Sequence, residues 1–323
     1  MSKKNHKTSV GGQALIEGIM MQGPKGVATA VRKSDGSIST EYHDVKHARD
    51  KLKFLGWPII RGVVAFVESM ILGYKLLMYS AEESGMEDLD DVEMSKFEKW
   101  LNDKFGEKLM DFIMGVATVL GFALAFVIFF YLPVFIFNRL NFAFHDVLTP
   151  WQGTIEGVIK IVIFLVYMLL VSRMKDIKRL FMYHGAEHKS ISCYESGMEL
   201  TVENVKQCSR FHPRCGTSFM FVMLILSIVV ITLFSLVVPD ELKHNRIIWM
   251  LIKLPLVPII MGIGYEFIKY AGKHDNALVK ILSAPGLWMQ RITTKEPDDD
   301  IIEVGIASIK AVITDNPEDD EIK

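Results

Sequence analysis

The chain has 323 residues, 50% of them hydrophobic, and a mean hydropathy of +0.27. Its formal net charge is −2 at pH 7, so it lacks the positive field that draws a protein to nucleic acid, and no nucleic-acid partner is expected. Charged residues gather in blocks between long apolar runs, which is typical of a multi-pass membrane protein that contacts the lipid bilayer. Three cysteines in a chain of this length exclude a disulfide framework.

The N-terminal region, residues 1–53, is predicted to be a cytoplasmic Gly-rich region with a β-hairpin. Alternating runs at 27–31 and 37–42 flank Asp35-Gly36, a pair that favours hairpin turns. We expect this region to supply the strands of a small cytoplasmic α+β unit.

Ahead of the hairpin, residues 11–24 hold many glycines, which permit close backbone approach or special dihedral angles. The stretch is not a Walker loop, because Gly-Lys-Ser/Thr is absent. A tight entry into the sheet is one interpretation, and a contact with a functional site is the other. On the second interpretation, Gln13 and Glu17 are candidate site residues.

Residues 54–80 form an apolar segment that contains Arg61, Glu68 and Lys75. We predict an interfacial or re-entrant helix at the cytoplasmic end of the membrane helices, because one further span would break the parity of the bundle. Arg61 and Glu68 are seven residues apart and share a helix face. They are expected either to orient groups near the site or to snorkel to the interface.

Residues 81–111 are predicted to be an acidic amphipathic segment, residues 112–270 a four-helix transmembrane bundle, and residues 271–323 a cytoplasmic tail. A bilayer requires roughly 20 helical residues. Four stretches meet that length and are the predicted spans: Phe112–Phe137, Thr154–Val171, Thr217–Val238 and Ile247–Tyr265. Flanking cations favour cytoplasmic N- and C-termini and a cytoplasmic loop at 172–216.

The loop 172–216 carries the side chains that are candidates for metal binding and catalysis. His184 and His188 are four apart, so on a helix they lie one turn apart on the same face. With Glu187 they form His-x-x-Glu-His, the inverted zincin pattern, in which two histidines bind zinc and the glutamate activates water. We therefore predict Glu187 as a catalytic residue.

Further candidate metal ligands follow in the same loop. Together with Glu187, the possible ligands are His184, His188, Cys193, Cys208, His212 and Cys215. A structural zinc uses four ligands, so the surplus favours a catalytic site, whereas three thiolates on one ion favour a structural one. A metal-free Cys–His nucleophile pair is a chemical alternative. A further alternative has the histidines as interfacial polar residues and the cysteines as small buried groups.

The end of this loop is predicted to begin the third span. Pro213 suits an early helical position, which places Cys215 beside a helix N-terminus. Arg214 or Arg210 is expected to hold an anionic group of the substrate, and we carry Arg214 forward as a catalytic candidate.

Four motifs make the chain resemble a known family of bacterial membrane proteins. The motifs are Gly11–Pro24, His184–His188, His212–Thr217 and Ala284–Pro297. They are similar to those of the YqhQ family, and the resemblance covers nearly the whole chain. It implies a multi-pass protein of the bacterial cytoplasmic (inner) membrane, in a family of unknown function described as predicted metal-dependent enzymes.

The predicted fold is an α-helical integral membrane protein with about four transmembrane helices, an interfacial or re-entrant helix and a small cytoplasmic α+β unit. The predicted function is that of a membrane-embedded, zinc-type metal-dependent enzyme. A hydrolase acting on an unknown substrate at the cytoplasmic membrane face is favoured. The alternative is a non-enzymatic scaffold or partner-binding protein with a structural Cys/His zinc site. A transporter or channel ranks last, because the spans hold few charges and no inverted repeat is evident.

Overall fold

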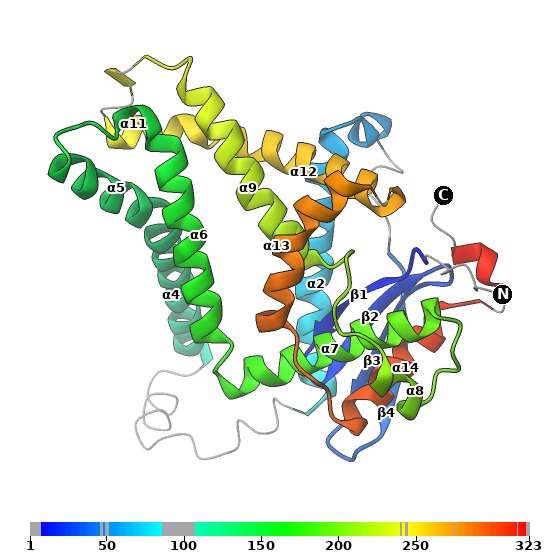
Figure 1. Cartoon of the computed structure of the whole chain (residues 1–323). Helices are drawn as coiled ribbons and strands as arrows, with labels where there is room; N and C mark the ends of the chain where they lie inside the picture. Colours follow the sequence, from blue (N-terminus) through cyan, green and yellow to red (C-terminus); the bar gives the residue numbers. More distant parts are fainter. Residues whose placement is uncertain are drawn as a thin grey trace. The chain divides into compact units, whose positions relative to one another are not determined.

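The computed structural model describes residues 8–45, 48, 52–85, 107–239, 241–242, 245–274, 276–314 and 316–320 (Figure 1). The chain divides into two compact units. Unit 1 comprises residues 1–85, 168–226 and 257–323, and unit 2 comprises residues 86–167 and 227–256. Most of the predicted acidic segment, residues 86–106, lies outside the described residues.

Unit 1 is built on a four-stranded antiparallel sheet in which neighbouring strands follow one another along the chain. The strands are β1 (Gly11–Leu15), β2 (Gly18–Gly23), β3 (Gly26–Arg32) and β4 (Ile38–His43). The predicted hairpin is confirmed as β3–β4, and Gly36 adopts a φ of 85° in its turn. The Gly-rich stretch forms a second hairpin, β1–β2, in whose turn Glu17 adopts a φ of 50°.

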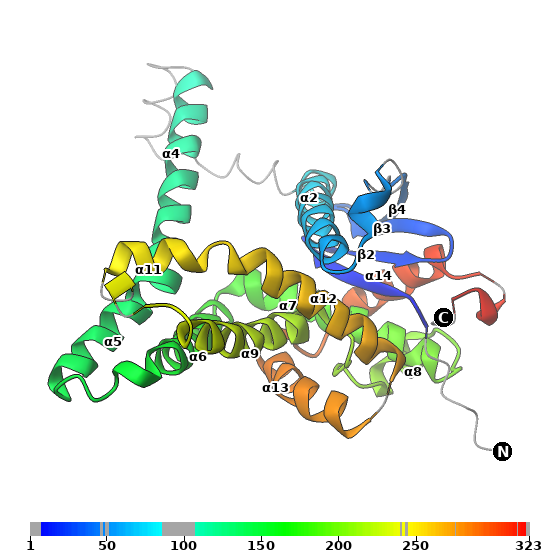
Figure 2. The same cartoon turned by 90° about the horizontal axis from the view of Figure 1, so that it is seen from above.

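Helices cover both faces of this sheet. One face packs against α7 (Lys175–Glu195) and α14 (Asp299–Val312), and the other packs against α2 (Ile60–Glu83) (Figure 2). The alternation of a strand explains the division, since Ile19 on β2 joins the core beneath α7 and α14 while its neighbour Met20 packs with Leu76 of α2. The sheet therefore has two buried faces.

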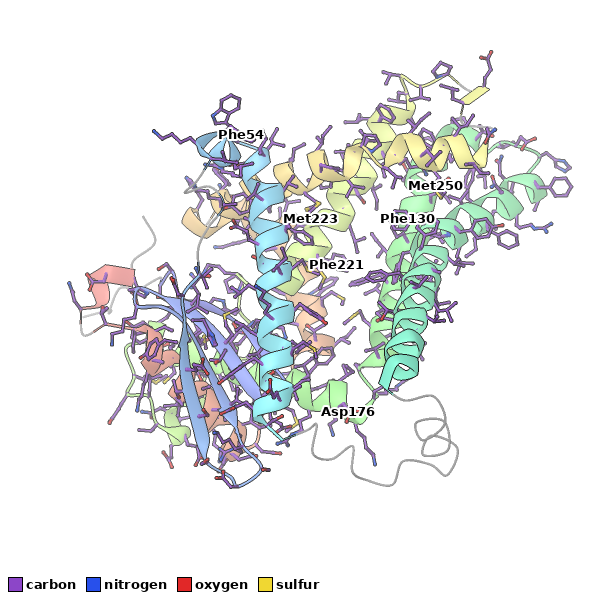
Figure 3. All side chains as sticks on the ribbon, turned by 180° about the vertical axis from the view of Figure 1, so that it is seen from behind. Phe54, Phe130, Asp176, Phe221, Met223 and Met250 are labelled. Carbon is purple, nitrogen blue, oxygen red and sulfur yellow. The ribbon has the colours of Figure 1, made fainter. Side chains whose placement is uncertain are left out.

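The segment predicted to be interfacial or re-entrant is one uninterrupted helix of 24 residues, α2, preceded by the short turn η1 (Lys53–Gly56). Figure 3 shows α2 running beside the sheet, with Phe54 of η1 at its N-terminal end. The helix is therefore continuous over most of the predicted segment, and whether it lies at the interface or crosses the membrane stays a prediction. The backbone N–H of Ile16 donates to Ser80 Oγ at 3.1 Å, which ties the C-terminal half of α2 to the sheet.

The N-terminal half of α2 approaches α12 (Leu256–Lys273) closely. A Cβ added to Gly62 would lie 2.6 Å from Cβ of Tyr265 and 3.0 Å from Cα of Gly262. Arg61 forms a bidentate ion pair with Glu266 of α12. The remaining helices of unit 1 are α8 (Val202–Gln207) and α13 (Ala277–Thr293), with the short η5 (Pro317–Asp320).

Unit 2 is helical in its described residues. Its elements are α4 (Glu107–Phe126), the π-helical turn η3 (Val127–Tyr131), α5 (Leu132–Ala143), η4 (Thr149–Trp151) and α11 (Arg246–Lys253). The boundary between the units falls within α6 (Gln152–Val171) and α9 (Gly216–Ser235), so each of these helices contributes to both units.

Among the described residues, four helices are long and apolar enough to cross a membrane. They are Ile60–Glu83, Gly115–Ala143, Thr149–Val171 and Ile247–Ala271. The last three match the first, second and fourth predicted spans, whereas the first is α2. The predicted third span is α9, in which Met220–Ser235 is a shorter apolar helix. The fourth predicted span is interrupted at Pro255, because α11 ends at Lys253 and α12 begins at Leu256.

Candidate metal centre

Three side chains of unit 1 converge on one point. His184 and His188 lie one turn apart on α7, as their spacing predicts, with ring centroids 4.5 Å apart. Cys215 immediately precedes α9, and its Sγ lies 3.2 Å from Nε2 of His184. One ligand atom from each of the three residues lies within 4.8 Å of the others. His188 and Cys215 are buried and His184 is half-buried, so the group lies at the edge of the protein interior.

Hydrogen bonds to backbone carbonyl oxygens fix the ring orientations of His184 and His188. Nδ1 of His184 lies 2.8 Å from the carbonyl oxygen of Thr293, and Nδ1 of His188 lies 2.6 Å from that of Arg210. A carbonyl oxygen can only accept, so we assign the proton to Nδ1 in each ring. Each Nε2 then keeps its lone pair for another partner. This is the usual arrangement of histidines that bind a metal through Nε2.

The carbonyl partner of His184 is placed by a glycine in α7. The chain that follows α13 runs against this helix, and the backbone N–H of Lys295 donates to Phe181 O at 2.8 Å. A Cβ on Gly185 would overlap the carbonyl oxygen of Lys295, well inside the 3.0 Å that real Cβ atoms respect. Gly185 thus permits the approach that brings Thr293 O to His184.

Glu187 lies beside the group but outside the three ligands. Its carboxylate is buried, with 5% exposure, and accepts a hydrogen bond from the backbone N–H of Gly12 on β1. Burial raises the pKa of Glu187, while the nearby His184 and the Gly12 hydrogen bond oppose that rise. A Cβ on Gly12 would meet Glu187 Cγ at 3.1 Å. The Gly-rich stretch therefore does approach the site, through Gly12.

The cysteines divide between two places. The thiol of Cys193 donates to the carbonyl oxygen of Glu199 at 3.5 Å, the thiol of Cys208 donates to that of Asn204 at 3.3 Å, and both side chains pack with Val205 and Ile302. Burial raises the pKa of Cys193 to about 12, which keeps this thiol protonated. Cys193 follows His188 by five residues, which turns it about 140° around the helix axis, away from the histidines. The expectation that three thiolates could surround one ion is corrected, because only Cys215 joins the group.

If the His184, His188 and Cys215 group holds zinc, replacing Cys193 by Ala or Cys208 by Ser should leave the zinc content at the wild-type level, because neither sulfur lies among the three candidate ligand atoms. The buried Cys193→Ala change should lower stability by roughly 1–2 kcal/mol, since it leaves a small cavity. Elemental analysis and thermal unfolding of the purified variants check both outcomes. Zinc lost from either variant would show that the second thiol pair also ligates the ion.

His212 belongs to a neighbouring polar cluster rather than to the ligand group. Its Nε2 lies 3.3 Å from Glu195 Oε2, and its ring centroid is 5.7 Å from that of His188. Gln290 holds the backbone of His212 with two hydrogen bonds, of 2.8 and 2.7 Å. Burial lowers the pKa of His212, so the ring is neutral near pH 7 and donates its Nε2 proton to Glu195.

Both arginines that were predicted to bind an anionic group of the substrate form ion pairs with glutamate side chains. Arg214 forms an ion pair with Glu195, the last residue of α7. Arg210 donates to the carbonyl oxygen of Thr294 and pairs with Glu296 at 3.1 Å. Arg214 therefore connects the segment before α9 to the end of α7, and its role in catalysis stays a prediction. Nothing in the sequence near Glu195 marked it as the partner of Arg214.

Glu195 should make stability depend on acid pH. Burial raises its pKa, but hydrogen bonds from His212 and Arg214 and the Arg214 charge lower it to about 2. The unfolded value is about 4.3, so the stabilisation is complete above that pH and is lost as pH falls toward 2. Glu195→Gln should therefore cost roughly 3 kcal/mol at pH 7, a difference that shrinks between pH 5 and 2. Unfolding measured across this range checks the effect, and a pH-independent difference would contradict it.

Two of the other candidates are structural in their contacts. Gln13 packs against Gly73 of α2, on the opposite face of β1 from Gly12. Glu17 forms a bidentate ion pair with Arg179, and its Oε2 accepts a 2.9 Å hydrogen bond from the hydroxyl of Tyr183. These contacts join the sheet to α2 and α7.

Arg61 and Glu68 form contacts with residues outside the His184, His188 and Cys215 group. Arg61 is engaged by Glu266, as described above, and Glu68 Oε1 accepts a hydrogen bond from the backbone N–H of Ala48. Neither residue is among the three ligands. Both side chains instead connect α2 to its neighbours in unit 1.

Four described helices of membrane-crossing length, a covered four-stranded sheet and a His–His–Cys group are consistent with a helical membrane protein that has a candidate metal centre. The model of the family described as "Protein of unknown function (DUF1385)" matches residues 57–315. The chain is 36% identical over 315 residues to "Uncharacterized protein YqhQ" of Bacillus subtilis (strain 168), which covers 97% of this chain and 95% of that protein. The chain belongs to this family, and the resemblance predicted from its motifs is confirmed. No solved structure matches.

Proposed function

We propose that His184, His188 and Cys215 bind a zinc-type divalent ion and that the protein is a metal-dependent enzyme, most simply a hydrolase. The supporting observation is the convergence of three ligand atoms within 4.8 Å. Catalytic zinc sites use three protein ligands and keep a fourth position for water or substrate, whereas structural sites close with four. Within the described residues this group offers three.

The donor chemistry suits such an ion. Two imidazoles oriented through Nδ1 and one thiolate are ligands that zinc prefers. Bound there, the ion would polarise a carbonyl or phosphoryl oxygen of a substrate and activate water. The chain's own contribution is to hold the ligands through Thr293 and Arg210. Glu187, anchored by Gly12, is proposed as the general base.

The proposed location is the cytoplasmic face of the bacterial inner membrane, with both termini inside. The support is the distribution of cations in the sequence, because the loop 172–216 is rich in Lys and Arg whereas the loop 138–153 has only Arg139. The substrate is then a molecule that reaches this face, either from the cytoplasm or from the inner leaflet.

A structural zinc site in a partner-binding scaffold is the second candidate. Burial favours it, because His188 is 1% exposed and Cys215 is 9% exposed. A closed site has no coordination position for an added ligand. The two candidates therefore differ in what a bound ion can accept.

Cobalt substitution tests the proposal. The Co²⁺-loaded protein should show visible bands that shift when azide is added, and Glu187→Gln should keep these bands and the fold while losing activity against ester and amide substrates. A Cys215→Ser control should lose the thiolate-to-cobalt band. Bands that azide leaves unchanged, with Glu187→Gln indistinguishable from wild type, would overturn the enzyme proposal in favour of the scaffold.

A further inference from the structure

Unit 2 contains a second cluster of polar side chains, inside two of the helices that are long enough to cross a membrane. Glu156 lies on α6, within Thr149–Val171, and Lys253 lies on α11, within Ile247–Ala271. Their ion pair, Lys253 Nζ to Glu156 Oε2, measures 2.7 Å. The charged side chains are therefore drawn together in an otherwise apolar region.

Each carboxylate oxygen of Glu156 accepts a hydrogen bond. Gln152 Nε2 donates to Glu156 Oε1 at 2.7 Å, while Lys253 occupies Oε2. The Glu156 side chain is only 7% exposed. A carboxylate this buried is stable as an anion only because both of its oxygens are paired.

The cations of the cluster outnumber its anion. Lys160 follows Glu156 by one turn of α6, and its charge interacts with those of both Glu156 and Lys253. Among the described residues, the Lys160 ammonium has no ion-pair partner and lies 5.6 Å from the centre of the Phe130 ring. The cluster thus holds two ammonium groups and one carboxylate.

An indole in the same cluster also lacks a partner. Trp249 is 1% exposed, and its Nε1 makes no hydrogen bond among the described residues. Its ring lies 4.7 Å from Lys253 Nζ. The cluster therefore contains a buried N–H donor without an acceptor as well as one ammonium group more than its carboxylate can pair, and both features favour an anionic acceptor.

We propose that this cluster binds the anionic oxygens of an amphiphile, with Lys160 and Trp249 as the principal donors. Charge inside a membrane is costly unless it is compensated, and an oxyanion would compensate Lys160. The ligand is expected to be an amphiphile because α6 exposes Val158 and Val162, of which 51% and 54% is accessible, so an alkyl chain can lie alongside. A fatty-acid carboxylate and a lipid phosphate share this chemistry. The proposed site shares no residue with the proposed metal centre, because its residues belong to unit 2 and those of the metal centre belong to unit 1.

Binding to the full-length protein in detergent micelles tests the proposal. The probes are oleate and phosphatidate, with methyl oleate and diacylglycerol as their neutral counterparts, measured by native mass spectrometry. Wild type should bind at least one anionic probe at least about tenfold more tightly than its neutral counterpart. Lys160→Met should weaken the affinity for the anionic probe about tenfold, whereas Lys160→Arg should keep it within about threefold of the wild-type value. Glu156→Gln should increase the affinity, because it removes the negative charge of the cluster.

The matched control is Lys175→Met, which removes an exposed lysine at the start of α7 and should not change binding. Preference for oleate would assign the ligand as a carboxylate, and preference for phosphatidate would assign it as a phosphate. Equal binding of anionic and neutral probes would overturn the proposal. So would a Lys160→Met protein that keeps the wild-type elution volume and thermal midpoint and binds as tightly as wild type.

Discussion

A His188→Ala protein should purify with less than about a tenth of an equivalent of zinc, where wild type carries about one. His188 supplies one of three ligands, and it is the most deeply buried of the histidines in the group, at 1% exposure. Two remaining ligands cannot hold the ion against a chelator, because affinity depends on the complete donor set. Elemental analysis after dialysis against a weak chelator measures the loss.

The control for this variant is His274→Ala, which removes an exposed histidine from unit 1 outside the group. Its zinc content should equal that of wild type. A His188→Ala protein that retains a full equivalent of zinc, with an unchanged elution volume, would contradict the assignment of His188 as a ligand.

Gly185→Ala should be the most destabilising small substitution in α7. The new Cβ would overlap a backbone oxygen, that of Lys295, so no side chain can move aside to relieve the clash. We expect a loss of at least about 3 kcal/mol and a thermal midpoint lowered by roughly 5–10 °C. Zinc affinity should fall as well, because Thr293 O would move away from Nδ1 of His184.

Gly115→Ala serves as the matched change, because a Cβ on this helical glycine meets nothing within 4 Å. It should leave stability unchanged or raise it by up to about 1 kcal/mol, since Ala favours the helix. Equal midpoints for Gly185→Ala and wild type would show that the 293–296 segment does not pack against α7 as described.

Local sequence signals predicted those parts of the site that depend on local geometry. The i, i+4 spacing of His184 and His188 was sufficient to place both rings on one face of a helix. The expectation that Pro213 occupies an early helical position is wrong, because Pro213 lies in a turn and α9 begins at Gly216, but Cys215 does lie beside the N-terminus of that helix. The Asp35-Gly36 pair likewise predicted the β3–β4 hairpin.

Long-range packing decided the rest, and no short motif encodes it. Which cysteine joins the histidines depends on where the chain after α8 returns to α7, and that return selects Cys215. The carbonyl partner of His184 comes from Thr293, more than a hundred residues away. Gly185 looked unremarkable inside its helix because its close neighbour, Lys295, belongs to a distant segment.

The contacts of α2 also depend on distant segments. The interfacial or re-entrant interpretation was favoured because one further span would break the parity of the predicted bundle. In the structure Arg61 is neutralised by Glu266 of α12, so the charge does not interrupt the helix. The sequence of α2 alone could not predict this ion pair, because Glu266 lies about 200 residues further along the chain.

Zinc-edge X-ray absorption of the purified wild-type protein tests the central claim most directly, because it counts the sulfur ligands. A centre made by His184, His188 and Cys215 predicts one sulfur at about 2.3 Å and two or three nitrogen or oxygen neighbours at about 2.0–2.1 Å. Two or more sulfurs, or protein free of zinc after growth with zinc in excess, would contradict it.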